Sequence, residues 1–232
     1  MTINTKTLAA IDIGTNAIRL FISNVEEYPT ETLFKKIAFL RVPIRLGEDV
    51  FTTGEIGQQK GKRLCETMQG FSYIMSAFNV ESYKAYATCA MREARNGKSV
   101  AEQIQKECDL NIEIISGTKE AETIFAGGMN EVVDDDKTYL YVDVGGGSTE
   151  VIVYSKSVKV EACSFPLGTV RMLNDAVDKE EMKHFKKWLK NITEKYTPDA
   201  IIGSGGNINK IHKLLNKKER ERITYQELDI LC

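Results

Sequence analysis

The chain has 232 residues, of which 42% are hydrophobic and 28% charged, and its formal net charge is −2. This composition is typical of a globular protein with one large or two ordinary domains, and the charge gives no general attraction to nucleic acid or anionic membranes. No apolar run approaches the ~20 residues that span a bilayer, and the N-terminus lacks a signal-peptide pattern. Five scattered cysteines without a CxxC pair indicate reduced thiols, so we expect a cytoplasmic protein.

The first predicted element is a β-hairpin over residues 8–22, with the sequence LAAIDIGTNAIRLFI. Its first strand is apolar except for Asp12, and apolar residues alternate with others after the break at Gly14-Thr15-Asn16. A carboxylate inside an apolar strand is costly unless it is paired or binds something. Asp12 therefore marks a candidate site, and the alternative is that it only braces its own turn.

The rest of the chain alternates between strands and helices, which favours an α/β fold with mixed sheets. In the first half we expect one or two strands over 33–46 with a break at proline, a loop over 47–57, a helix with the apolar stripe Leu64, Met68, Phe71, Met75 and Phe78, a strand that enters a turn over 80–90, a helix over 99–108 and a short strand over 111–116. In the second half we expect a helix over 118–132, a hairpin over 139–153, a helix over 179–196, and a strand, glycine loop and helix over 199–215.

The second hairpin, YLYVDVGGGSTEVIV at residues 139–153, repeats the first. Both copies contain an apolar strand, an Asp, a glycine turn and a second apolar strand, so Asp143 matches Asp12. Two copies of one unit predict two related α/β domains, over residues 1–125 and 126–232. Glycine turns after a strand can direct backbone N–H groups at phosphate. Two such turns that face each other can hold a phosphate chain, with the carboxylates on its metal.

Four further motifs join the hairpins: ATCAMREARN (87–96), ISGTKEAETIF (115–125), FPLGTVRM (165–172) and IGSGGN (202–207). Together with DIGTNAIRL and DVGGGSTE, in this order, they resemble the exopolyphosphatase and guanosine pentaphosphate phosphohydrolase family of the actin-like, sugar kinase and Hsp70 superfold. The resemblance implies two actin-like (ribonuclease H-like) domains, each a mixed sheet flanked by helices, with a cleft between them. It also implies that family members continue past the end of this chain, whose second domain is therefore expected to be truncated.

The resemblance implies hydrolysis of a phosphoanhydride with Mg²⁺ (or Mn²⁺), a reaction that needs charge stabilisation and a positioned water. Asp143 and Glu150 match residues close to the family's metal and phosphates, so they are candidate metal ligands. Asp12, by the internal repeat, is a third. Glu120 matches the proposed general base that deprotonates the attacking water. The alternative for Glu120 is a first-turn glutamate that only stabilises its helix.

Arg92 follows a predicted strand and offers a guanidinium for bidentate phosphate contact, so we assign it a catalytic role; a surface arginine is the alternative. Arg19 faces either the cleft or solvent, and the third glycine turn either holds a distal part of the substrate or packs a helix against a strand. The residues expected to bind substrate phosphates are Gly14, Thr15, Asn16, Arg19, Gly145, Gly146, Gly147, Ser148, Gly205 and Gly206.

The implied activity is that of an exopolyphosphatase, which releases orthophosphate from the end of inorganic polyphosphate. Closure of the two domains would bring Glu120 against the terminal phosphate. The nearest alternative is hydrolysis of guanosine pentaphosphate, which the motifs do not separate from the first. An ATP-dependent kinase of the same superfold and a non-catalytic sensor of polyphosphate or alarmone are the others. A homodimer is implied, whereas nucleic acid and membrane partners are not expected.

Overall fold

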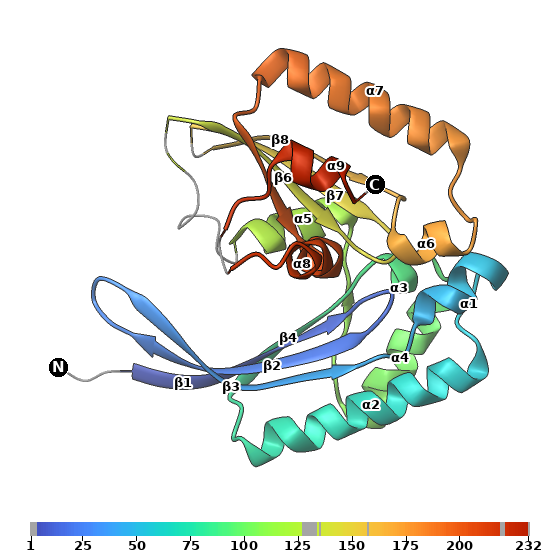
Figure 1. Cartoon of the computed structure of the whole chain (residues 1–232). Helices are drawn as coiled ribbons and strands as arrows, with labels where there is room; N and C mark the ends of the chain where they lie inside the picture. The colour runs from blue at the N-terminus through green and yellow to red at the C-terminus, as the bar shows by residue number, and fades with distance from the viewer. Residues whose placement is uncertain (1–3, 127–133, 135, 157, 219–220, 232) are drawn as a thin grey trace. The chain divides into compact units, whose positions relative to one another are not determined.

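The computed structural model describes residues 4–126, 134, 136–156, 158–218 and 221–231. The chain divides into two compact units, Met1–Ser116 and Gly117–Cys232 (Figure 1). The sequence predicted a boundary after residue 125, near the end of helix α5 (Gly117–Ala126), whereas the observed boundary lies before this helix. This helix belongs to the second unit because it packs against strands of the second sheet.

The first unit is built on a five-stranded sheet with the strand order β3-β2-β1-β4-β5. Strands β1, β2 and β3 are antiparallel neighbours, whereas β4 is parallel to β1 and β5 is parallel to β4. The elements of this unit are β1 (Asn4–Ile13), β2 (Ile18–Glu27), β3 (Thr32–Val42), α1 (Leu46–Thr53), α2 (Gln58–Ala77), β4 (Ser82–Ala87), α3 (Cys89–Glu93), α4 (Gly97–Cys108) and β5 (Glu113–Ile114).

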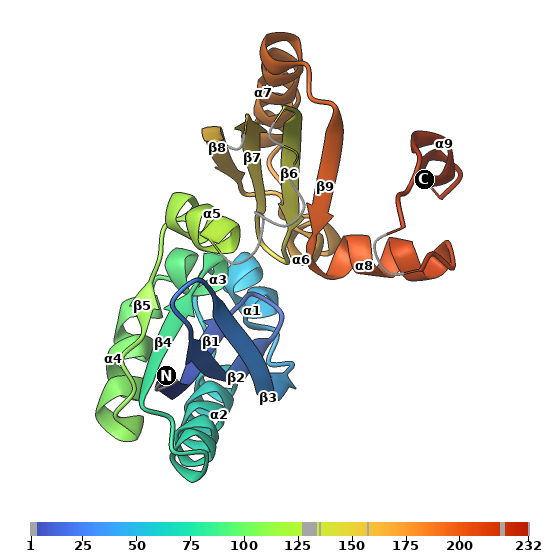
Figure 2. The same cartoon turned by 90° about the vertical axis from the view of Figure 1, so that its left-hand side faces the viewer.

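Helix α2 contributes the predicted apolar stripe to the core of the first unit. Leu64, Met68, Phe71 and Met75 are buried, at the spacing that places them on one face of a helix. Burying each of these side chains contributes about 1.5–3 kcal/mol. Phe78 is 42% exposed as the C-cap residue, so the stripe ends one turn earlier than predicted. Helix α4 packs beside α2, as Figure 2 shows.

The expectation of a loop over residues 47–57 is wrong for its first half, which forms α1. Leu46 and Val50, one helical turn apart, are both buried, and their burial holds this short helix on the core. Gly54 ends it in the left-handed conformation at φ 79°, with its N–H donating to the Val50 carbonyl at 3.0 Å. Eight residues with two apolar anchors give too weak a periodic signal to distinguish a helix from a turn.

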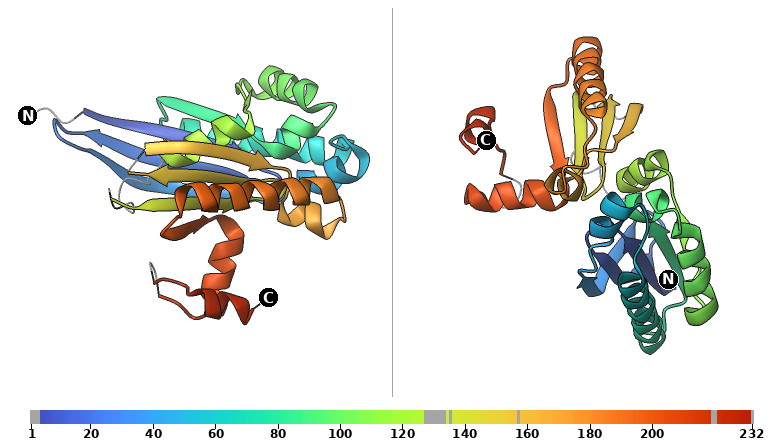
Figure 3. Two further views of the ribbon diagram at one scale, coloured as in Figure 1. Left: turned by 90° about the horizontal axis from the view of Figure 1, so that it is seen from above. Right: turned by 90° about the vertical axis from the view of Figure 1, so that its right-hand side faces the viewer.

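The second unit is built on a four-stranded sheet with the order β8-β7-β6-β9. Two apolar clusters lie on its opposite faces, one containing Ala121 of α5 and the other Ile192 of α7. Figure 3 shows α7 running alongside these strands. Besides α5, the elements of this unit are β6 (Thr138–Val144), β7 (Thr149–Ser155), β8 (Val158–Phe165), α6 (Thr169–Leu173), α7 (Lys179–Tyr196), β9 (Ala200–Ser204), α8 (Gly205–Leu214) and α9 (Tyr225–Asp229).

The two sheets have the same core topology. In each, the first strand is antiparallel to the second and parallel to the fourth, so β1 to β4 correspond in order to β6 to β9. The predicted internal repeat and the α/β fold are therefore confirmed. Within the described residues, no helix has both the length and the apolar character needed to cross a membrane.

Candidate functional site

Two acidic residues stand opposite each other on β6 and β7. Asp143 and Glu150 are register partners in this antiparallel ladder. The outer strands add a serine to each, because Ser204 Oγ donates to Asp143 Oδ1 at 3.1 Å and Ser164 Oγ donates to Glu150 Oε1 at 2.8 Å. The ladder also pairs Ser204 with Asp143 and Ser164 with Glu150. These four residues form one row across the sheet, here called the acidic row.

The acidic row lies on the face of the sheet that α5 covers. Side chains two residues apart on a strand point to the same face, so Asp143 shares a face with Tyr141. Tyr141 is buried and packs in one cluster with Ala121 of α5. Glu120, the neighbour of Ala121 in the first turn of α5, is half-buried. The predicted general base and the two predicted metal ligands of the acidic row thus belong to one compact unit.

The glycine turn between β6 and β7 is held from one side by the start of α6. The carbonyl oxygens of Gly145, Gly146 and Gly147 accept hydrogen bonds from residues 169–171, at 2.8–3.1 Å. A planar trans peptide directs its C=O and N–H in opposite directions. The N–H groups of Gly146, Gly147 and Ser148 therefore point away from α6. Successive N–H groups on one side of a turn make a concave site suited to an anion.

The turn between β1 and β2 is held in a similar way by the segment that follows β3. Thr15 O accepts from Gly47 N at 3.0 Å, and Asn16 O accepts from Arg45 N at 2.9 Å. By the same peptide geometry, the N–H groups of Asn16 and Ala17 point away from this segment. Both predicted phosphate turns are thus supported by the stretch after the third strand of their own unit.

One glycine N–H in each turn is used internally. Gly145 N donates to Ser148 O at 2.9 Å, and Gly14 N donates to Ala17 O at 3.2 Å. These two N–H groups close their turns, whereas the sequence suggested that both glycines contact phosphate. The donors directed outward come from the residues that follow them.

Asp12 and Arg19 of the first unit form an ion pair. They are register partners in the β1–β2 ladder, and Arg19 Nη1 donates to Asp12 Oδ2. The same row continues to Arg41 on β3 and Tyr86 on β4. Asp12 was a third candidate metal ligand, and this contact gives its carboxylate a positive partner within its own unit.

Arg92 lies on the short helix α3 in the first unit. Its side chain is half-buried, and its Nη1 donates to the Ile115 carbonyl at 2.8 Å. This contact supports the end of the chain segment that leads from β5 into α5. Arg92 therefore lies in the first unit, whereas Glu120 lies in the second. At least one N–H donor of Arg92 is hydrogen-bonded within the protein.

The predicted third glycine loop is not a loop, since α8 begins at Gly205 directly after β9. Gly205 has a φ of +93°, and a Cβ there would lie 2.6 Å from Asp143 Oδ1. Glycine is required at this junction because the backbone passes so close to the carboxylate. Gly206, in the first turn of α8, is exposed, and a Cβ at this position would have no neighbour within 4 Å.

Four residues at these sites were not predicted from the sequence. Ser164 and Ser204 belong to the acidic row, Arg171 is buried with its Nε bonded to Gly147 O at 2.9 Å, and Arg45 supports the first turn. Each is placed by strand register or by the stretch after a third strand. A signal for Arg171 was available in the sequence, since it lies in the FPLGTVRM motif.

The acidic row offers oxygen atoms only, which are the ligands that Mg²⁺ prefers. Among the described residues, no group of three or more His, Cys, Asp and Glu side chains is arranged to hold a metal ion. Mg²⁺ commonly binds one or two carboxylates together with waters and substrate phosphates. The pair Asp143 and Glu150 fits that second kind of site.

Known relatives of this chain differ in size, as two of them show. Exopolyphosphatase 1 of Mycobacterium tuberculosis is 24% identical over 225 residues, which are 89% of this chain and 63% of that protein. A bifunctional 3-dehydroquinate synthase/phosphatase of Fusobacterium nucleatum is 32% identical over 168 residues, which are 71% of this chain and 25% of that protein. The chain thus spans from a quarter to just under two-thirds of the length of these relatives.

Two crystal structures have the same fold. An exopolyphosphatase from Cytophaga hutchinsonii has a TM-score of 0.80 and 25% identity, covering 96% of this chain and 74% of that one. The Aquifex aeolicus member of the Ppx/GppA family has a TM-score of 0.75 and 25% identity, covering 98% of this chain and 78% of that one. The profile of the Ppx/GppA phosphatase family matches residues 22–231. With this match and the duplicated actin-like fold, the chain belongs to the Ppx/GppA phosphatase family.

Proposed function

We propose that this chain hydrolyses the terminal phosphoanhydride of inorganic polyphosphate and releases orthophosphate. Family membership and the exopolyphosphatase relatives support the class of reaction. The observation that carries the proposal is the pair Asp143 and Glu150 next to a glycine turn with outward N–H groups. A phosphate anion and its metal counter-ion require such neighbouring sites.

The backbone N–H groups of Gly146, Gly147 and Ser148 bind oxygen atoms of the phosphate that is released. They are fixed before substrate arrives, because their carbonyl neighbours are bonded to residues 169–171. Fixed dipoles of this kind stabilise developing charge without reorganisation during the reaction. In the first unit, Asn16 and Arg19 are the candidate phosphate contacts of the β1–β2 turn, and Arg92 is a further guanidinium suited to bidentate phosphate contact.

Asp143 and Glu150 hold the metal ion, and Ser204 and Ser164 orient their carboxylates. When bound, Mg²⁺ neutralises charge on phosphate oxygens as a Lewis acid. Glu150 is 1% exposed, so its charge is costly to bury without compensation.

Glu120 accepts the proton of the attacking water. As the water oxygen forms its bond to the terminal phosphorus, the anhydride oxygen leaves with the shortened chain, and the water proton passes to the Glu120 carboxylate. The neighbouring candidate, Glu122, is exposed and forms an ion pair with Lys159 at 3.1 Å. The lower exposure of Glu120, which is half-buried, supports it as the base, and Glu122 serves as a matched control.

The test is phosphate release from long-chain polyphosphate, with and without Mg²⁺, by the wild-type protein, Glu120→Gln and Glu122→Gln. We expect Mg²⁺-dependent release by the wild type, a loss of about 10²-fold or more in Glu120→Gln, and near-normal turnover in Glu122→Gln. Turnover by Glu120→Gln at the wild-type rate contradicts the assigned base. The absence of release by the wild type contradicts the proposed function.

Guanosine pentaphosphate is offered in a parallel assay because it ends in the same type of bond. Release from this nucleotide alone would support the proposed reaction but assign it guanosine pentaphosphate as the substrate. Binding of polyphosphate without release from either compound would instead indicate a sensor of phosphate chains.

A further inference from the structure

Arg45 has a backbone conformation that arginine rarely adopts. Its φ of 60° and ψ of 51° lie in the left-handed region, where a Cβ approaches the following carbonyl oxygen. Arg45 precedes helix α1, whereas N-cap residues normally have extended backbone. The other described non-glycine residues with positive φ follow a helix or turn a hairpin, where this conformation is common: Asn79, Asp109, Lys156, Asp175, Thr197 and Asn216.

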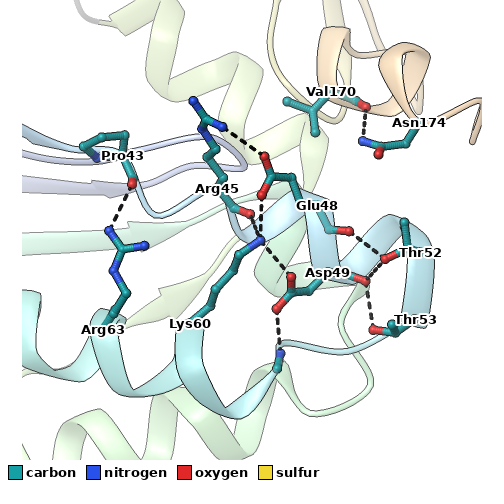
Figure 4. Close-up of polar contacts among 11 residues, drawn as sticks. Pro43, Arg45, Glu48, Asp49, Thr52, Thr53, Lys60, Arg63, Val170 and Asn174 are labelled. Atoms are coloured by element: carbon teal, nitrogen blue, oxygen red, sulfur yellow. Dashed lines mark hydrogen bonds and ion pairs between the residues drawn. The ribbon is translucent and has the colours of Figure 1, made fainter.

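Hydrogen bonds on both sides of Arg45 maintain this conformation. Its N–H donates to Asn16 O at 2.9 Å, and its carbonyl accepts from Lys60 Nζ at 2.8 Å (Figure 4). Lys60 is in turn held by the carboxylates of Glu48 at 2.9 Å and Asp49 at 2.7 Å. The strained residue is thus fixed beside the turn that is expected to bind phosphate. Such over-determined strain is typical of functional positions.

The side chain of Arg45 contributes little to the fold. It is 63% exposed, and it extends away from Lys60 and α2 in Figure 4. Its Nη1 donates to Glu48 Oε1 at 3.3 Å, but the other oxygen of that carboxylate binds Lys60 at the shorter distance of 2.9 Å. An exposed ion pair of this kind adds little stability. A guanidinium has five N–H donors, so this contact leaves it able to bind a phosphate.

We propose that Arg45 binds a phosphate group of the polyphosphate chain beside the first-unit turn, whose Asn16 carbonyl accepts a hydrogen bond from the Arg45 N–H. The proposal rests on the proposed function and adds a substrate contact to it. A guanidinium suits this role because it can donate two parallel hydrogen bonds to one phosphate. The backbone hydrogen bond to Asn16 fixes the Arg45 backbone, from which the side chain extends, beside the turn.

A purely structural role for Arg45 makes a different prediction. If the side chain only supported the fold, replacing it would lower stability and leave substrate affinity unchanged. Glycine adopts the left-handed conformation without strain and retains both backbone hydrogen bonds. Arg45→Gly is therefore expected to melt at or above the wild-type temperature while it binds polyphosphate more weakly. Opposite changes in stability and affinity are the signature of a side chain that is retained for binding.

The experiment compares wild type, Arg45→Gly, Arg45→Lys and the control Arg63→Gln in melting temperature, KM, kcat and equilibrium binding of polyphosphate. Arg63 lies nearby on α2 and is exposed, and its hydrogen bond to Pro43 O is long, at 3.4 Å. The substitution Arg63→Gln removes the same positive charge as Arg45→Gly. We expect KM to rise about tenfold or more in Arg45→Gly with little change in kcat. Arg45→Lys should recover part of the loss, and Arg63→Gln should resemble the wild type.

A KM within twofold of the wild type in Arg45→Gly would overturn the proposal, as would an equal rise in Arg63→Gln. Equilibrium binding separates this result from failure of the proposed function. The wild type could bind polyphosphate without releasing phosphate, while Arg45→Gly binds it about tenfold more weakly. That result would support the Arg45 contact and contradict the proposed hydrolase activity. If the wild type does not bind polyphosphate at all, both proposals fail.

Discussion

Asp143 and Glu150 face each other across β6 and β7 at the place where Asp12 and Arg19 face each other across β1 and β2. The first-unit pair carries opposite charges and forms an ion pair. The second-unit pair carries two carboxylates. Like charges directly opposite each other destabilise a sheet, so the second pair is suited to a bound cation in a way that the first is not.

Mg²⁺ should therefore stabilise the wild-type protein through this pair. We expect calorimetry to show a higher melting temperature in Mg²⁺ than in EDTA, with about 2.7 kcal/mol gained at a hundred times the Kd. Asp143→Asn removes one carboxylate and should lose most of this gain. Asp12→Asn is the matched control and should keep it, because Arg19 already neutralises Asp12. A full Mg²⁺ effect in Asp143→Asn would contradict the assigned ligands.

Sequence reasoning predicted the parts of this fold that depend on local pattern. The duplicated hairpins, the stripe of α2 and the helix over 179–196 follow from periodicity and glycine turns, and the structure confirms them. Glu120, Asp143 and Glu150 were assigned by motif, and their roles stay predictions. Their membership in one unit could not be predicted, because it depends on which sheet α5 packs against.

The partners of the acidic row depend on strand register. Ser164 stands opposite Glu150 only after a register shift at Val153 and Tyr154 in the β7–β8 ladder. Such a bulge moves every later pairing by one residue, and no turn-forming residue in the sequence indicates its position. Arg45 was missed for a related reason, because its left-handed backbone is imposed by contacts with Asn16 and Lys60 rather than by local preference.

Gly168 should not tolerate a side chain. A Cβ there would lie 2.4 Å from backbone atoms of Gly146 and Gly147, so the support of the glycine turn would have to move. We expect Gly168→Ala to lose about 1–3 kcal/mol of unfolding free energy in urea, together with most turnover. Gly70→Ala is the control, since that helix position has open space and should gain about 0.5–1 kcal/mol. Equal stability of the two variants would show that the turn adapts.

Ser164→Ala should cost more stability than an exposed serine does. The hydroxyl donates to Glu150 at 2.8 Å, and that carboxylate is almost fully buried. Removing a donor from a buried charged group costs about 1–3 kcal/mol. Ser99→Ala is the control, because its hydroxyl makes an exposed bond to the Asn96 carbonyl. We would compare urea midpoints of both variants; a smaller loss in Ser164→Ala than in Ser99→Ala would count against the acidic row as a stable network.

Cys65 should react slowly despite being partly accessible. Burial, followed by hydrogen bonds to Glu107 and Cys108, raises the pKa of the Cys65 thiol from 9.0 to about 12. The thiol donates to Glu107 at 2.9 Å. Since only the thiolate is nucleophilic, iodoacetamide at about pH 8 should label Cys65 far more slowly in the folded protein than in urea. Peptide mass spectrometry would measure both rates, and equal rates would contradict the raised pKa.

The raised pKa of the Cys65 thiol makes the free energy of unfolding depend on pH. The unfolded chain loses the Cys65 proton near pH 9, before the folded protein does near pH 12, so the stabilisation is complete below 9 and is lost as the pH rises. The urea midpoint of the wild type should therefore fall more steeply above pH 9 than that of Cys65→Ala. Both proteins share every lysine and tyrosine, so their difference isolates this thiol. Parallel slopes would show that Cys65 titrates alike in the folded and unfolded states.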